Sequence, residues 1–466
     1  RTCLAFSTQY QFFAGSIVTS SSMSGIKLFL VFVTHLFASK AQDLSSFTGL
    51  ISSLLPFNTA CVAGGQRGIC ETLVTCGGAG GISVGTGSCT LGKICCQHRV
   101  TCGGILTKVH GVFRNPAYPS SDTQKSVCHL QVLILPTTCA VSFDFQEFQV
   151  GTRENGLCYH DYFNILNLPG SNMVNLCGNM KGHWQTFYIS SGSTPMLDVY
   201  SVLQTSNKWF INIIQHDNCT IPNLESPDCG NENVLSQTPT DTDPMNYPWA
   251  SSLMNKDKSL YCGATLLTAS YVITVPQCVS RYTVDDVWVV VGHSETSTVD
   301  TYVQSRKASR LVFPWTYKST ASQIIDGFAL VKMESPVSFT SHHLPICFPS
   351  LGELPQESKT TMAGRSYPST KPTRKLFTSG GPIISSADCT NRVTPWGLAI
   401  NTDIVCVQET GPCTNQTGHA SSITRANSKH ELAGVLAMKV CGDNSPVTSL
   451  FTSLNRKKHW MLLNLR

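Results

Sequence analysis

Val287-Trp288-Val289-Val290-Val291 and Phe328-Ala329-Leu330-Val331-Lys332-Met333 are two short apolar runs in the C-terminal half of the chain. Short continuous apolar runs are typical of buried β-strands, whereas helices need longer periodic segments. Residues 229–466 show no alternation of strands with helical patterns, which a parallel α/β sheet would require. We therefore predict an all-β double barrel with one closing C-terminal helix for this part of the chain.

A second β pattern precedes it, in residues 102–219. Val141-Ser142-Phe143-Asp144-Phe145 alternates apolar and polar side chains, and the run from Val132 to Leu135 is continuously apolar. Turn formers interrupt these strands, as in Asn115-Pro116 and Pro169-Gly170. Short strands separated by turns predict a β-sandwich.

Residues 61–96 form a glycine-rich segment with six cysteines: Cys61, Cys70, Cys76, Cys89, Cys95 and Cys96. So short a segment cannot bury enough apolar surface alone, and disulfides must stabilise it. Sequence does not choose among the possible pairings. A metal site is the alternative, but it is disfavoured because the segment lacks histidine and has no paired Cys-x2-Cys units.

Composition narrows the class of protein. The chain has 466 residues, of which 21 are cysteines and 13 % are charged, with a net charge of +5. So many cysteines indicate a secreted multidomain protein, because reduced cytosolic proteins rarely form disulfides. The net charge is too small for its length to indicate a nucleic-acid partner. No stretch of about 20 apolar residues follows the N-terminal region, so we expect no internal membrane span.

The N-terminal region carries a predicted secretory signal peptide. Residues 23–41 combine a basic start at Lys27, a short apolar stretch and a small-x-small exit, although a buried helix or strand is the alternative. We interpret residues 1–22, which contain Cys3, as a non-native or unprocessed segment upstream. Processing would leave residues 42–60 as a linker and an even number of cysteines, in keeping with a secreted, extracellular protein.

The C-terminal half resembles the trypsin-like serine proteases. The motifs that carry the resemblance are Tyr247-Pro248-Trp249-Ala250, Cys262-Gly263-Ala264-Thr265-Leu266-Leu267, Tyr271-Val272-Ile273-Thr274 with Cys278, Ala329-Leu330-Val331-Lys332-Met333, Leu344-Pro345-Ile346-Cys347, Leu432-Ala433-Gly434-Val435 and Cys441-Gly442. We therefore identify residues 229–466 as a serine protease-like domain. The resemblance implies disulfides between Cys229 and Cys347, Cys262 and Cys278, Cys389 and Cys406, and Cys413 and Cys441.

Two further resemblances cover the N-terminal half. Residues 102–219 closely resemble a CUB domain in Cys102-Gly103-Gly104-Ile105, Gly111-Val112-Phe113-Arg114-Asn115-Pro116, Cys158-Tyr159-His160-Asp161-Tyr162 and Cys177-Gly178. This resemblance implies the pairs Cys102–Cys128, Cys158–Cys177 and Cys139–Cys219. Residues 61–96 resemble the clip domain of arthropod secreted proteases in cysteine order.

The CUB resemblance also raises a calcium site. Many CUB domains bind Ca²⁺ through a Glu and two Asp, which are hard oxygen ligands. Asp161 matches the middle ligand, but Gly151 stands where the Glu is expected, and Glu154 lies in a loop of different size. We therefore expect Asp161 to cap a turn, with calcium as the alternative and no other cofactor.

The protease resemblance assigns three positions to a catalytic triad, and all three are altered. Gln277 occupies the place of the His, and its amide does not titrate, so it cannot act as a general base. Gly327 occupies the place of the Asp, with Asp326 one residue early and expected on the other strand face. Thr417 replaces the nucleophilic Ser and is a weak nucleophile without an adjacent base. His419, two residues away, is a poor candidate for that base.

Activation and specificity positions are altered as well. The family is cut after Arg or Lys to expose an N-terminal Ile-Val-Gly-Gly, and here that place falls on residues 236–239, without a preceding basic residue. Gln416 replaces the Asp that receives the new amino group, and Gly411 stands at the base of the specificity pocket. Ser379-Gly380-Gly381-Pro382 imitates the nucleophile motif, but it lies too early and lacks a preceding Cys-x-Gly-Asp, so we predict a turn there.

Surface features give weaker predictions. Asn218 and Asn415 begin Asn-x-Thr sequons for glycosylation, with an unused sequon as the alternative. Arg374-Lys375 and Arg456-Lys457-Lys458-His459 are short basic runs, which we interpret as solvated surface rather than as a patch for heparin-like or acidic partners.

The function predicted from the sequence is that of a secreted, non-catalytic serine protease homologue. It would bind extracellular proteins, including active proteases or their substrates, as a cofactor or regulator of a proteolytic cascade or as a component of saliva or venom. The alternatives are an active endopeptidase with a rearranged site and an adhesion protein that binds through its CUB domain.

Overall fold

The chain divides into two units, Arg1–Thr59 and Ala60–Arg466. A computed structural model describes residues 59–89, 92–153, 157–168, 174–189, 193–202, 206–220, 223–231, 246–292, 303–319, 323–350, 352–364, 377–409, 413–442 and 446–465. Cys3 and the predicted signal peptide lie outside the described residues. No helix in those ranges is both long and apolar enough to cross a membrane.

The first part of the second unit, residues 60–100, is here called the cysteine module. It contains β1 (Ala60–Ala63), β2 (Gln66–Glu71), α4 (Leu73–Gly78), β3 (Gly81–Ser83) and β4 (Ile94–Val100). Thr72 caps α4, because its side-chain oxygen accepts a hydrogen bond from the Thr75 amide at 3.1 Å. The disulfides left open by the sequence are Cys61–Cys95, Cys70–Cys89 and Cys76–Cys96.

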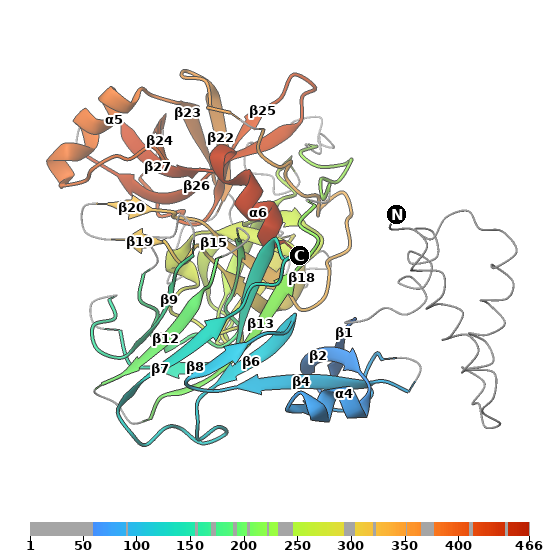
Figure 1. Ribbon diagram of the computed structural model, residues 1–466. Helices are drawn as coiled ribbons and strands as arrows, with labels where there is room; N and C mark the ends of the chain where they lie inside the picture. Colours follow the sequence, from blue (N-terminus) through green and yellow to red (C-terminus); the bar gives the residue numbers. More distant parts are fainter. Residues whose placement is uncertain are drawn as a thin grey trace, which may run out of the picture. The chain divides into compact units, whose positions relative to one another are not determined.

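The sandwich, residues 104–216, has two sheets (Figure 1). One contains β6 (His110–Arg114), β13 (Lys208–His216), β8 (Ala140–Val150), β10 (Gly178–Asn179) and β11 (Trp184–Tyr188), and the other contains β5 (Gly104–Leu106), β7 (Ser126–Val132), β12 (Met196–Ser201) and β9 (Tyr162–Leu166). The cysteine module extends the first sheet, because β4 pairs in parallel with β6. Disulfides join Cys102 to Cys128, Cys139 to Cys219 and Cys158 to Cys177.

The barrel region, residues 250–464, contains two barrel-like sheets (Figure 1). The first closes as β14 (Ala250–Met254), β15 (Leu260–Thr268), β16 (Tyr271–Thr274), β21 (Ala329–Met333), β18 (Gln304–Val312) and β17 (Trp288–Val291). The second runs in the order β23 (Phe377–Pro382), β22 (Lys359–Gly364), β25 (Ala420–Thr424), β26 (His430–Val440), β27 (Val447–Ser453) and β24 (Ile404–Glu409).

Short elements complete the barrel region. They are η2 (Pro276–Cys278), β19 (Lys318–Ser319), β20 (Ile324–Ile325), α5 (Ser386–Val393), η3 (Thr394–Trp396), η4 (Asn455–Lys457) and α6 (Lys458–Asn464). Disulfides join Cys262 to Cys278, Cys389 to Cys406, Cys413 to Cys441 and Cys229 to Cys347. The all-β prediction with a terminal helix is therefore confirmed.

Trp315 of the barrel region packs into the sandwich. Only 1 % of its surface is exposed. Its ring centroid lies 5.1 Å from Phe145, 5.6 Å from Phe187 and 5.9 Å from Phe143, all on strands of the sandwich. Aromatic pairs at such separations add favourable contact energy to the burial of apolar area. The two regions therefore share one apolar core.

Backbone hydrogen bonds reinforce this contact. The Leu311 amide donates to the Gly182 carbonyl at 3.0 Å, and the Val174 amide donates to the Trp315 carbonyl at 2.9 Å. Gly182 has a φ of +83°, and a Cβ atom there would lie 2.2 Å from Cγ1 of Val284. Only glycine accommodates both this conformation and so close an approach.

His183 is fully buried in the same contact. Its Nε2 donates to the Tyr282 carbonyl at 3.0 Å. Burial, partly opposed by this hydrogen bond, lowers the pKa of His183 from 6.5 to about 4. Charging this imidazole inside the protein is therefore unfavourable.

We expect the protein to lose stability on acidification from pH 6.5 towards pH 4. In this window the unfolded chain binds a proton at residue 183 that the folded state does not, which lowers the free energy of unfolding by about 1.4 kcal/mol per pH unit. His183→Gln should weaken this dependence, because the amide keeps a donor without titrating. Thermal unfolding at pH 7 and pH 4.5 measures it, with exposed His160→Gln as control. Equal losses in parent and His183→Gln would contradict the prediction.

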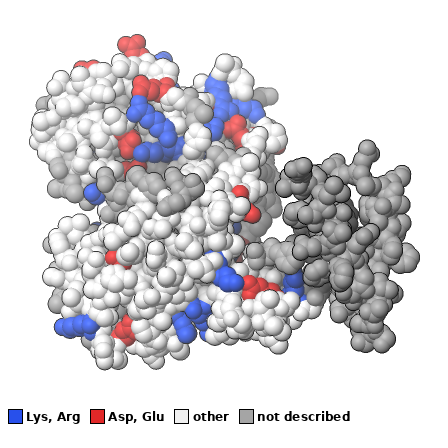
Figure 2. Space-filling view, viewed as in Figure 1, with Lys and Arg blue, Asp and Glu red and all other residues white. Residues whose placement is uncertain are grey.

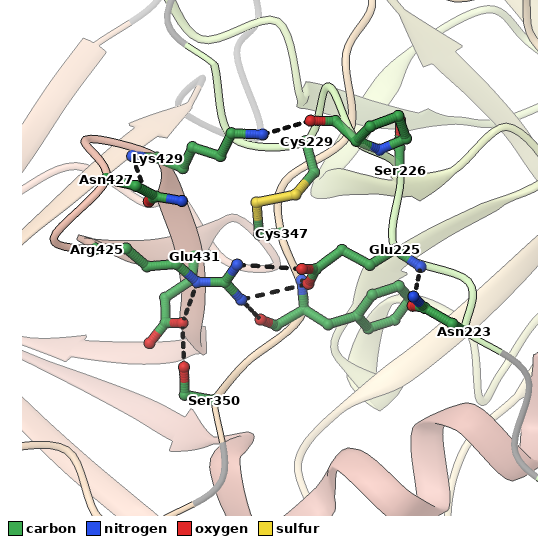
Figure 3. Close-up of polar contacts among 12 residues, drawn as sticks. Asn223, Glu225, Ser226, Cys229, Cys347, Ser350, Arg425, Asn427, Lys429 and Glu431 are labelled. Carbon is green, nitrogen blue, oxygen red and sulfur yellow. Dashed lines mark hydrogen bonds and ion pairs between the residues drawn. A yellow bond between two sulfur atoms is a disulfide. The ribbon is translucent and has the colours of Figure 1, made fainter.

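The segment before the barrel region is tied to it by a charged cluster (Figure 3). The guanidinium of Arg425 donates to both carboxylate oxygens of Glu225, at 3.1 and 3.3 Å, and its Nε donates to Glu431 at 2.7 Å. The Cys229–Cys347 disulfide lies beside this cluster. Figure 2 shows acidic and basic side chains interspersed among many uncharged residues on the face it displays, in line with the low charged fraction.

Candidate functional site

The loop from Cys413 to Ala420 carries Thr417, which stands at the predicted nucleophile position. It connects β24 to β25, and the Gly263 amide donates to the Thr417 carbonyl at 2.8 Å. The Thr417 hydroxyl donates to Oδ1 of Asn415 at 2.7 Å. Among the described residues, this hydroxyl therefore bonds within its own loop and to no imidazole.

Gln277, at the predicted base position, lies in η2 immediately before Cys278. Its Oε1 is buried and has no hydrogen-bond partner among the described residues. A primary amide neither gains nor loses a proton near neutral pH. This side chain therefore cannot take a proton from a hydroxyl.

Asp326, next to Gly327, is likewise bonded to no imidazole in the part of the chain that the structure describes. Its carboxylate accepts hydrogen bonds from the Thr316 hydroxyl at 2.5 Å and from Lys457 at 2.7 Å. A Cβ atom on Gly327 would lie 2.7 Å from the Thr452 hydroxyl oxygen. The backbone at this position therefore has no room for an aspartate side chain unless its surroundings move.

His419 is a buried packing residue within the same loop. It is 1 % exposed. Cβ atoms built on Gly263 and Gly364 would lie 2.4 and 2.2 Å from Cδ2 of its ring, so the imidazole fills the space between two glycines. Backbone hydrogen bonds hold both residues in place. The His419 amide donates to the Gln416 backbone carbonyl at 3.2 Å, and the Thr417 carbonyl accepts from the Gly263 amide.

A buried ion pair lies behind the loop and was not predicted from the sequence. Lys439 of β26 and Glu409 of β24 are 2.6 Å apart, with side chains 4 % and 1 % exposed. Lys439 also donates to Oε1 of Gln416 at 2.9 Å, and Glu409 accepts from the Ser449 hydroxyl at 2.7 Å. The sequence signal for this pair was a single lysine near the end of β26, after the mostly apolar run from Leu432 to Met438.

Ser379 corrects one prediction. Ser379-Gly380-Gly381-Pro382 belongs to strand β23, and not to a turn. Cβ atoms on Gly380 and Gly381 would lie 2.0 and 1.9 Å from the carbonyl oxygens of Thr360 and Gln408, so the glycines permit close strand packing. The Ser379 hydroxyl donates to Gln416 at 3.5 Å.

Several predicted positions lie outside the described residues. They are Glu154, residues 236–239, Arg374-Lys375 and Gly411.

Comparison with known families decides the class of both larger regions. Residues 238–461 match the family described as Trypsin, and residues 102–210 match the CUB domain. The chain contains a trypsin-like serine protease domain and a CUB domain. The barrel region and the sandwich are these two domains, and we call them the protease-like domain and the CUB domain below.

Curated relatives resemble the protease-like domain in sequence. The rat protein named Transmembrane protease serine 11G is 25 % identical over 224 residues, which are 46 % of this chain and 52 % of the relative. Its mouse counterpart is 25 % identical over 227 residues, which are 47 % of this chain and 52 % of the relative. The chain thus spans about half the length of these relatives. The clip-like resemblance and the arthropod type stay predictions.

Asp161 of the CUB domain lies in a buried turn. It is 4 % exposed, and its carboxylate accepts a hydrogen bond from the Val202 amide. A Cβ atom on Gly151 would lie 2.4 Å from the Asp161 carbonyl oxygen, so a larger residue could not take this position without displacement. Within the described ranges, Asp161 is not gathered with two further carboxylate or histidine ligands.

Three other clusters bring potential metal ligands within 4.8 Å of one another: Cys61 with Cys89 and Cys95, Glu71 with Cys96 and His98, and Glu225 with Cys229 and Cys347. All their cysteines are disulfide-bonded, so they offer no thiolate to a metal. The sequon residues Asn218 and Asn415 are both exposed, as a glycan would require.

Proposed function

We propose that this protein is a secreted, non-catalytic serine protease homologue that acts by binding other extracellular proteins. It would serve as a cofactor or regulator of a proteolytic cascade, or as a component of saliva or venom. The observation that carries the proposal is the Thr417 hydroxyl bonded to Asn415, with an amide at residue 277 where a general base would be needed.

The buried Lys439–Glu409 pair supports the same proposal. Both side chains occupy the interior behind the Thr417 loop, where they contact Gln416 and Ser449. Interior filled by an ion pair is not open to a substrate side chain. The disulfides around this altered loop are retained. A stable fold without catalytic groups favours a function in protein binding rather than in catalysis.

We expect the purified protein to show no hydrolysis of short ester or peptide substrates above a heat-denatured control. A serine-reactive phosphonate probe should label neither Thr417 nor Ser379, because neither hydroxyl is bonded to a titratable base among the described residues. Mass spectrometry of the probed protein, with active trypsin as positive control, measures the labelling. Labelling at either residue, with hydrolysis abolished by Thr417→Ala or Ser379→Ala, would establish an active endopeptidase instead.

A further inference from the structure

A polar cavity of about 630 Å³ lies where the CUB domain meets the protease-like domain. The CUB domain contributes Gln149, Thr152, Arg153 and Asn179, and the protease-like domain contributes Ser280 and Arg281, among the residues that line it. Its volume falls within the range typical of small-molecule sites. Because both domains supply side chains, the complete cavity exists only while the CUB domain packs against the protease-like domain, which we call the docked arrangement.

Two arginines, Arg153 and Arg281, line this cavity. No aspartate or glutamate lines it among the described residues. Nε of Arg153 donates to the Cys177 carbonyl at 3.3 Å, which fixes the orientation of its guanidinium. Burial, followed by the positive charge of Arg281, lowers the pKa of Arg153.

The uncharged polar residues that line the cavity indicate which groups a ligand would carry besides an anion. Gln149 and Asn179 offer amides, and Thr152 and Ser280 offer hydroxyls. The cavity therefore lines its two arginines with uncharged hydrogen-bond donors and acceptors. Guanidinium groups bind tetrahedral oxyanions through paired, charge-assisted hydrogen bonds. A bare sulfate would fill little of this volume, whereas a sugar ring carries hydroxyls that match the amides and hydroxyls of the lining.

We propose that this cavity binds a small sulfated saccharide, with a sulfate group held between Arg153 and Arg281. The ligand would contact both domains at once. Binding would therefore stabilise the docked arrangement and raise the temperature of unfolding with ligand concentration.

Calorimetric titration of the full chain with a sulfated heparin-type disaccharide tests this proposal. The unsulfated disaccharide and sodium sulfate, at matched ionic strength, are the comparison ligands. We expect binding of the sulfated sugar, at least tenfold weaker binding of either comparison ligand, and a thermal shift with the sulfated sugar alone. Equal binding of sodium sulfate or of the unsulfated sugar would overturn the assignment to a sulfated saccharide.

Variants locate the site. Arg281→Gln should weaken binding of the sulfated disaccharide at least tenfold, and because Arg281 is exposed, this variant should fold like the parent. Arg153→Gln should do the same. Arg306→Gln removes an equal charge from β18, away from the cavity lining, and should bind like the parent. Unchanged affinity in Arg281→Gln, or an equal loss in Arg306→Gln, would overturn the proposal.

Discussion

Trp315→Ala is expected to lower the free energy of unfolding by about 3–5 kcal/mol, as large truncations in a packed core do. The side chain is 1 % exposed, and four phenylalanines of the CUB domain surround it: Phe143, Phe145, Phe163 and Phe187. Alanine would leave a cavity between the two domains, because the surrounding strands can close it only in part.

Calorimetric unfolding of Trp315→Ala is the direct measurement. We expect a lower transition temperature and separate unfolding of the CUB and protease-like domains, since their shared core is lost. Trp396→Ala is the matched control, because Trp396 is 56 % exposed and should cost little. A Trp315→Ala protein that unfolds in one transition at the parent temperature would refute a shared core.

Strand positions in the protease-like domain were predictable from short-range patterns. The apolar runs at residues 287–291 and 328–333 became β17 and β21, shifted by one residue at their starts. These strands are buried on both faces, so a continuous apolar run is the whole signal. The altered triad positions stay predictions: Gln277 and Thr417 were assigned by their spacing from Cys278 and Cys413, and Gly327 by its place two residues before Ala329.

Contacts between domains were not predictable in the same way. Val141-Ser142-Phe143-Asp144-Phe145 alternates as if one face met water, yet Ser142 and Asp144 are 0 % and 3 % exposed. The polar face is covered from elsewhere in the sequence, for example by Arg67 of the cysteine module, 3.6 Å from Asp144. Arg310 of β18 also lies over the Trp184 ring at 3.9 Å. Single-strand periodicity carries no information about partners so distant in sequence.

Lys439→Met is expected to lower the free energy of unfolding by about 3–5 kcal/mol, the usual cost of leaving one buried charge unpaired. Glu409 would then remain 1 % exposed, with the Ser449 hydroxyl as its retained hydrogen-bond donor. The side-chain Oε1 of Gln416 would also lose the hydrogen bond from Lys439. The variant should therefore loosen the Thr417 loop as well as destabilise the domain.

A double-mutant cycle separates the ion pair from the other contacts of both residues. Because a buried ion pair can be replaced by apolar groups of similar volume at little cost, Lys439→Met/Glu409→Met should recover most of the stability lost by either single variant. Chemical denaturation of the four proteins gives the coupling energy. Arg456→Met is the control, because its pair with Glu353 is exposed on both sides and should be worth less than about 1 kcal/mol.

The same cycle bears on the proposed lack of catalysis. If the double variant folds but still hydrolyses no ester, the inactivity rests on the missing base at Gln277 and not on the ion pair behind the loop. If it gains hydrolysis that Thr417→Ala abolishes, the ion pair alone restrained an otherwise competent site, and the argument from the amide at residue 277 fails. If the double variant instead loses as much stability as the two single variants together, Lys439 and Glu409 act independently. The proposed role of the ion pair in filling the interior behind the Thr417 loop would then be refuted.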